Sequence, residues 1–140
     1  MKKKSLLVAM VTCGILSSVL SGFLVMASND DIFFTFRIGS YQENGRDSHG
    51  RYRQTNDVNN PWKVKMTYTG EGSNTITNYW MENSATTNVT PTVSVTQGKG
   101  YYYENAYSSA NGTTVYLTAE NNNFNGSAYN VSGYWDEETW

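Results

Sequence analysis

Hydrophobic and polar residues alternate along several short stretches of the chain after residue 28. In the clearest stretch, residues 62–68, Trp62, Val64, Met66 and Tyr68 alternate with two lysines and a threonine. A period of two is typical of a strand with one buried and one solvated face. The pattern therefore predicts an antiparallel strand with those four side chains turned toward a core.

Similar patterns recur along the chain, and turn-forming residues separate them at short intervals. The predicted strands are residues 32–38, 62–68, 75–82, 89–96, 101–107, 113–119 and 128–135. Residues 41–60 show no period and are predicted to be a long irregular loop, whereas residues 97–100 and the Asn111-Gly112 pair are predicted hairpin turns. About seven short strands predict an all-β antiparallel β-sandwich, with a small barrel as the alternative.

The first 27 residues have the layout of a secretory signal peptide. Three lysines precede an apolar stretch, and Ala27–Ser28 is a suitable cleavage site because small residues stand before it. Cleavage there would leave one domain, residues 28–140, outside the cell. The apolar stretch is about 20 residues long, enough to span a bilayer, so an uncleaved N-terminal membrane anchor is the alternative.

Cysteine content and charge narrow the class of protein. Cys13 is the only cysteine and lies inside the predicted signal, so the exported domain would be free of disulfides, which suits a Gram-positive exterior. The formal net charge is −2, and loss of the three signal lysines makes it more negative. An acidic, lysine-poor domain argues against nucleic-acid partners and against the cationic membrane-attacking peptides.

No catalytic constellation stands out. The only histidine, His49, follows Asp47 and Ser48, but a hydrolase triad is a spatial arrangement rather than three neighbours in one loop. The arginines around His49 could instead form an anion-binding loop. We expect a solvated loop and a protein that is not an enzyme.

Two segments raise the question of a metal, and neither predicts one. Residues 121–126 place asparagines at the first, third and fifth positions before Gly126, as in a calcium loop, but Ser132 stands where the essential glutamate is needed. An Asn-rich loop held by Asx turns is the simpler expectation. The acidic segments 29–31 and 136–138 could hold a divalent cation only if the termini meet, and solvated ends are expected instead.

The aromatic residues are the best indication of a binding surface. Four tryptophans and eleven tyrosines are too many for one small core, so some rings must be exposed, where they could bind sugar rings or protein partners. Consecutive strand residues point to opposite faces, so residues 101–103 expose at least one ring. The alternative is that these tyrosines only pair across strands. The candidate ligand-binding residues are Tyr101, Tyr102, Tyr103, Trp135 and Trp140.

Three segments resemble a known family. Residues 60–64 (NPWKV), the Gly-Glu-Gly turn at 70–72 and residues 131–139 (VSGYWDEET) are similar to an uncharacterised family of small exported proteins of Bacillus and relatives, a domain of unknown function. That family has no activity to transfer. A weaker likeness in size, export signal and absence of cysteine is to the lactococcin-type β-sandwich bacteriocins, from which the acidic charge departs.

These observations together predict a secreted, non-enzymatic protein that acts at the cell envelope. A bacteriocin-like factor is the leading hypothesis. The alternatives are a carbohydrate- or cell-wall-binding module and a structural matrix protein. The expected partner is an envelope component or polysaccharide, with no cofactor and no nucleic acid.

Overall fold

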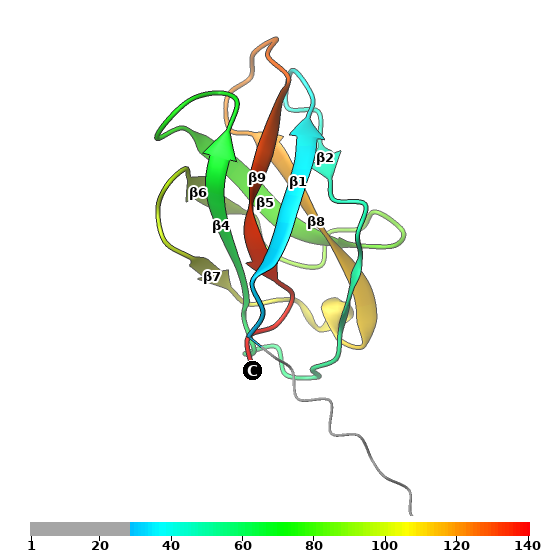
Figure 1. Cartoon of the computed structure of the whole chain (residues 1–140). Coiled ribbons are helices and arrows are strands. Elements are labelled where there is room, and N and C mark those ends of the chain that lie inside the picture. The colour runs from blue at the N-terminus through cyan, green and yellow to red at the C-terminus, as the bar shows by residue number, and fades with distance from the viewer. Residues whose placement is uncertain (1–28) are drawn as a thin grey trace, which may run out of the picture.

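Two antiparallel sheets pack face to face as a sandwich in the computed structural model, which describes residues 29–140 (Figure 1). The sheets keep open edges and do not close into a barrel. The all-β sandwich predicted from the alternating pattern is thus confirmed. The predicted signal peptide and its cleavage site at Ala27–Ser28 lie outside the described residues.

Nine strands form the two sheets, against the seven expected. They are β1 (Ile32–Ile38), β2 (Gly45–Arg46), β3 (Arg51–Arg53), β4 (Trp62–Thr69), β5 (Ile76–Asn83), β6 (Val93–Thr96), β7 (Tyr102–Glu104), β8 (Thr113–Asn121) and β9 (Tyr129–Asp136). The one helical element of the described residues is a single 3-10 turn, η1, at Ser108–Ala110. Among these residues, therefore, no helix could cross a membrane.

The strand order mixes elements that are distant in sequence. The first sheet has the order β1-β9-β4-β7, and the second has the order β2-β8-β5-β6, with β3 also paired to β8. In Figure 1, β1, β9 and β4 form the near layer, while β5 and β8 lie behind them. The last strand, β9, therefore lies between the first strand and β4.

The core fills the space between the two inner faces. Trp62, Val64 and Met66 of β4 and Trp135 of β9 are fully buried there. From the other sheet, β5 and β8 contribute buried hydrophobic side chains, as the period of two requires. At about 25 cal/mol for each Å² of apolar surface buried, these residues supply the main stabilisation of the fold.

Two expectations about the connections are wrong. Residues 41–60 are not one irregular loop, because β2 and β3 lie within them and pair with β8. The segments at 97–100 and Asn111-Gly112 are not hairpin turns either. Each lies between strands of different sheets, since β7 belongs to the first sheet while β6 and β8 belong to the second.

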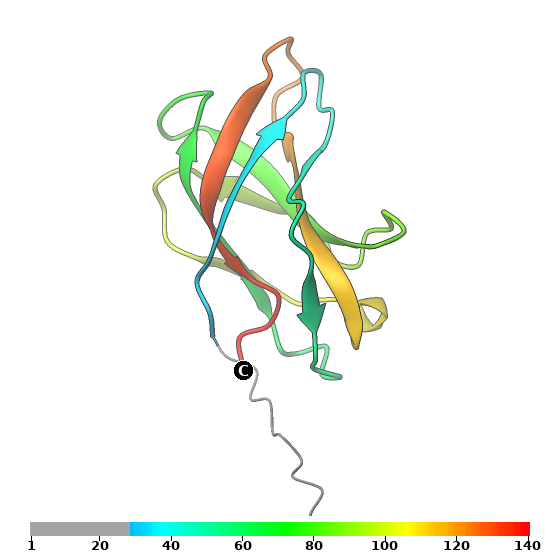
Figure 2. The same ribbon diagram turned by 45° about the vertical axis from the view of Figure 1, so that its right-hand side comes forward.

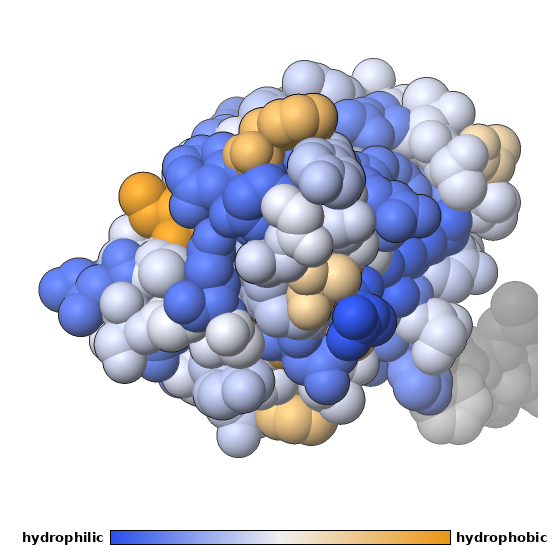
Figure 3. Space-filling model, turned by 90° about the horizontal axis from the view of Figure 1, so that it is seen from above, coloured by the Kyte–Doolittle hydropathy of each residue, from blue (hydrophilic) through white to orange (hydrophobic). Residues whose placement is uncertain are grey.

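The beginning and the end of the described chain lie at the same end of the sandwich (Figures 1 and 2). The backbone N–H of Asp30 donates to a carboxylate oxygen of Asp136 at 2.5 Å. The loops β1–β2, β4–β5 and β8–β9 lie at the opposite end. Figure 3 looks down on that end, which is mostly hydrophilic with separate hydrophobic spots.

Candidate ligand-binding face

The outer face of the four-stranded sheet carries aromatic and lysine side chains in register. Phe33 of β1 lies opposite Tyr134 of β9, and Tyr134 lies opposite Lys65 of β4. One step along the strands, Lys63 lies opposite Tyr103 of β7. Directly opposed residues of an antiparallel pair share a face, so these side chains gather on the side of the sheet that faces away from the core.

A β-bulge in β4 adds a further ring to this face. The pairing with β9 shifts between Met66 and Tyr68, so that Tyr68 lies opposite the outward-facing Ser132. Tyr68 is therefore 55% exposed, and Thr69 is buried. The expectation that Tyr68 faces the core with Trp62 is wrong, because a bulge inserts one residue and reverses the alternation beyond it.

Gly133 of β9 lies beside this bulge. A Cβ built there would lie 1.9 Å from the Lys65 carbonyl oxygen and 3.0 Å from the Met66 Cα. Only glycine lets the two backbones approach so closely. The glycine and the bulge thus fix β4 against β9 at the point where Tyr68 turns outward.

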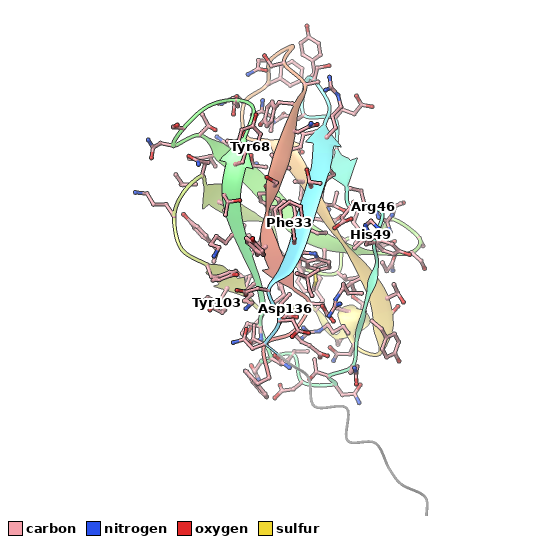
Figure 4. All side chains as sticks on the ribbon, in the orientation of Figure 1. Phe33, Arg46, His49, Tyr68, Tyr103 and Asp136 are labelled. Atoms are coloured by element: carbon pink, nitrogen blue, oxygen red, sulfur yellow. The ribbon has the colours of Figure 1, made fainter. Side chains whose placement is uncertain are left out.

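We call Phe33, Tyr68, Tyr101, Tyr103 and Tyr134 the aromatic face. Phe33, Tyr68 and Tyr103 are each more than half exposed, and Figure 4 shows these three on the near side of the sheet. The rings of Phe33 and Tyr134 meet edge to face at 5.7 Å, and those of Tyr101 and Tyr103 lie 6.3 Å apart. Neighbouring contacts of this kind hold the rings in place and reduce the entropy lost on binding.

The aromatic face is broad and follows a sheet surface. Four strands at the usual spacing of about 4.8 Å extend roughly 14 Å from β1 to β7. A small-molecule site is usually concave and encloses most of its ligand. The outer surface of a sheet matches an extended polymer or another macromolecule better.

Two lysines lie among the rings, and they differ in their partners. Lys63 is almost fully buried and donates to Asp31 at 2.8 Å. The Lys65 Nζ lies 4.4 Å from the centre of the Tyr101 ring and 5.2 Å from that of Tyr134. Cation–π contact holds Lys65 in place without neutralising its charge.

The charges around Tyr101 are set by these contacts. The hydrogen bond from Lys63 lowers the pKa of Asp31, which therefore stays ionised near neutral pH. Partial burial, with the nearby Asp31 carboxylate as a further cause, raises the pKa of Tyr101. The Tyr101 ring next to Lys65 is thus neutral, and the negative charge of Asp31 beside it is already paired with Lys63.

The structure separates the five residues selected from the sequence. Tyr101 and Tyr103 belong to the aromatic face. Tyr102 packs against the core, and its hydroxyl accepts a hydrogen bond from the backbone N–H of Thr96. Trp135 is fully buried, so its ring cannot contact a surface ligand. Trp140 is 60% exposed, but it is the last residue and lies beside Asn60, away from the aromatic face.

The acidic segments 29–31 and 136–138 do meet, but the carboxylates of residues 136–138 accept hydrogen bonds from other groups of the protein. Asp136, Glu137 and Glu138 are buried rather than solvated, against the sequence expectation. Glu137 accepts from Arg51 at 2.8 Å, and Glu138 accepts the backbone N–H groups of residues 54 and 55. No cluster of metal-ligating side chains is found among residues 29–140. Residues 136–138 thus bind both the beginning of the described chain, at Asp30, and the segment 51–55. We call residues 136–138 the clasp.

The Asn-rich loop binds a carboxylate of the protein itself. Asn121, Asn123 and Asn125 each donate a side-chain amide N–H to Glu71 at 3.2–3.4 Å. The amide oxygens of Asn121 and Asn125 accept backbone N–H groups two residues ahead, which confirms the expected Asx turns. Because those oxygens already accept hydrogen bonds and the amide N–H groups point toward Glu71, the loop binds a carboxylate of the protein rather than a cation.

Asp47, Ser48 and His49 do not form a catalytic triad. Asp47 and Ser48 both contact the same ring nitrogen of His49, Nδ1, at 3.1 and 3.3 Å. In a triad the acid and the nucleophile bind opposite nitrogens of the imidazole. Figure 4 places Arg46 and His49 away from Phe33, Tyr68 and Tyr103.

The arginines of this segment do not converge on one site. Arg46 lies over the Tyr116 ring and forms an ion pair with Glu82, whereas Arg51 binds Glu137. Arg53 is buried and donates to backbone carbonyls. An anion-binding loop built from the three arginines is therefore not formed.

Comparison with known proteins identifies a family to which no function is assigned. Residues 22–139 match the family described as protein of unknown function, DUF2712. The chain belongs to this family. No curated protein and no solved structure matches it significantly.

The sequence pattern found part of this DUF2712 surface and missed the rest. Alternation within residues 32–38 and 128–135 already places Phe33 and Tyr134 on the outer side. The same alternation within residues 62–68 places Lys65 on the solvated side of its strand but does not indicate which rings lie beside it. For Tyr68 the alternation points to the core side, and only the bulge turns this residue outward.

Proposed function

We propose that this protein is an exported, non-enzymatic binding protein that attaches to cell-envelope polysaccharide through the aromatic face. The observation that carries the proposal is the exposure of Phe33, Tyr68 and Tyr103, from three different strands, on one broad surface. Rings exposed this far lose contact with water when the apolar faces of sugar rings pack on them. A sheet surface offers several such contacts in a row, as a polymer requires.

Export remains part of the proposal, and it rests on the predicted signal peptide together with the absence of cysteine after Cys13. Placement of the family among Bacillus and its relatives rests on the sequence resemblance. A bacteriocin-like action is a different outcome of binding at the envelope. It would appear as inhibited growth of related Gram-positive cells exposed to the purified protein.

The test compares binding of the protein and two variants to isolated cell-wall polysaccharide by co-sedimentation. The triple variant F33A/Y68A/Y103A truncates the three exposed rings of the aromatic face. The control Y52A/Y107A/F124A truncates three rings that are similarly exposed elsewhere. We expect the first variant to bind roughly tenfold or more weakly, and the control to bind like the unmodified protein.

Equal binding by both variants would refute the proposal, as would the absence of any binding by the unmodified protein. If the unmodified protein instead forms oligomers that F33A/Y68A/Y103A abolishes, the aromatic face serves self-association. That result would favour a matrix role over a polysaccharide-binding one. Analytical ultracentrifugation of the same three proteins measures this directly.

A further inference from the structure

Lys65 carries a positive charge in the middle of the aromatic face. Among the residues that the structure describes, ion pairs engage Arg46, Arg51 and Lys63, but none engages Lys65. The chain as a whole is acidic, with a formal net charge of −2. A cation that forms no ion pair and lies between the half-buried rings of Tyr101 and Tyr134 on an acidic protein is a feature that selects among ligands.

We propose that the aromatic face takes an anionic glycan in which phosphodiester groups link the sugars, with one phosphodiester at Lys65. The inference rests on the proposed polysaccharide-binding function and specifies the class of polymer. Sugars on either side of that phosphodiester would lie on the two halves of the face. One half is formed by Phe33 and Tyr134, and the other by Tyr101 and Tyr103.

The position of the charge relative to the rings favours phosphodiesters over sugar acids. The Lys65 Nζ lies between the rings of Tyr101 and Tyr134 rather than beyond them. In a sugar–phosphate polymer the negative charge likewise lies between consecutive sugars. In a polyuronate the carboxylate is attached to the sugar ring itself, so stacking of that ring would not bring the charge midway between two aromatic rings.

The type of cation agrees with this assignment. Lysine presents a compact point charge and is a common partner of phosphate, and it does not require the planar, two-pronged geometry that arginine imposes on its anions. Arg46, Arg51 and Arg53 are all engaged with other parts of the protein. The exposed Arg37 lies on the outer side of β1, but it is opposite Asn130 and four residues from Phe33 rather than beside Lys65.

The test measures binding of the purified protein to three polymers of similar length by isothermal titration. They are a glycosyl-phosphate polymer, polygalacturonate and dextran, which is uncharged. The variants are K65Q and, as the matched control, K99Q, which removes an exposed lysine from the turn after β6. Urea unfolding of each variant checks that the fold is kept.

We expect the unmodified protein to prefer the glycosyl-phosphate polymer. K65Q should weaken that binding roughly threefold to fivefold, abolish the preference over dextran and lessen the effect of sodium chloride. K99Q should leave all three affinities unchanged. The affinity of K65Q for dextran should equal that of the unmodified protein, because the aromatic rings that bind uncharged sugars are unchanged.

Equal affinity for dextran and the glycosyl-phosphate polymer would overturn the inference and leave the proposed function standing. A stronger preference for polygalacturonate would overturn it in favour of sugar acids. Failure of the proposed function is distinguishable from both, because F33A/Y68A/Y103A would then bind every polymer as the unmodified protein does.

Discussion

Arg53 is a charged side chain that solvent does not reach. Its guanidinium donates to the backbone carbonyls of Glu137, Asn60 and Asp57. The planar guanidinium carries five N–H groups, and those on its two terminal nitrogens serve all three acceptors. One residue therefore joins β3, the β3–β4 loop and the last residues of the described chain.

Replacing Arg53 should be costly for this reason. R53A leaves buried carbonyl groups without donors, and we expect the free energy of unfolding to fall by roughly 3 kcal/mol. R53K keeps the charge but lacks the planar guanidinium, so it should recover only part of the loss. Urea denaturation measures both.

The control for Arg53 is Arg37, an exposed arginine on β1. R37A should change the free energy of unfolding by no more than about 0.5 kcal/mol. Equal losses in R37A and R53A would show that the buried hydrogen bonds do not stabilise the clasp.

Asp136 should make stability depend on pH in an unusual direction. Burial, with the Glu137 carboxylate as the next cause, raises the pKa of Asp136 to about 7 from its ordinary 3.8. Between those values the folded state holds a proton that the unfolded chain has released. The stabilisation is therefore greatest below about pH 4 and is lost as the pH rises through about 7.

D136N removes this titration. We expect the stability of D136N relative to the unmodified protein to improve as the pH is raised from 4 to 8. Urea midpoints of the two proteins at each pH give the difference, in which the titrating groups that do not interact with Asp136 cancel. A difference independent of pH would mean that the carboxylate is not protonated in the fold.

At the scale of elements, the contact between β4 and β9 shows what an alternating pattern can and cannot predict. The strand at residues 62–68 is present, and its first three apolar residues face the core as predicted. Beyond Met66 the bulge reverses the faces. A pattern of hydrophobic residues fixes which side of a strand is buried only while the pairing stays regular.

The remaining differences have related causes. Strands of two and three residues, such as β2 and β3, are too short to show a period. The turn residues at 98 and 112 correctly marked changes of direction, with positive φ at Gly98 and Gly112. They could not indicate that the chain changes sheets there, because a turn sequence carries no information about the partner strand.

Gly133 offers a test of the bulge contact. G133A places a methyl group against the Lys65 carbonyl, and overpacking of this kind destabilises by about 1–3 kcal/mol. G100A is the control, since a Cβ at Gly100 meets no atom within 4 Å. Thermal unfolding should show a lower midpoint for G133A and an unchanged or slightly higher one for G100A.

At the scale of the whole molecule, β9 is the strand on which the first sheet depends. It pairs with β1 along seven residues on one side and with β4 on the other. Without it, β1 has no partner within its sheet. The clasp around Asp136, Glu137 and Glu138 also follows β9 directly.

A chain that ends after residue 128 should therefore fail to fold. We expect it to lack a cooperative unfolding transition, as measured by circular dichroism against urea concentration. A chain that ends after Glu138 keeps β9 and the clasp and should still unfold cooperatively. A folded chain without β9 would show that the five-stranded sheet is stable by itself.

The central place of β9 has a consequence for the nascent polypeptide. The 90 residues 39–128 separate β1 from the strand that covers its edge. At 5–20 residues per second, translation leaves β1 uncovered for roughly 5–20 s. Its sequence, IFFTFRI, is rich in aromatic and β-branched residues, the composition of segments that aggregate through unpaired edges. We therefore expect β1 to lack its partner strand until translation is almost complete, and a chaperone that covers β1 during that time would reduce its association with other chains.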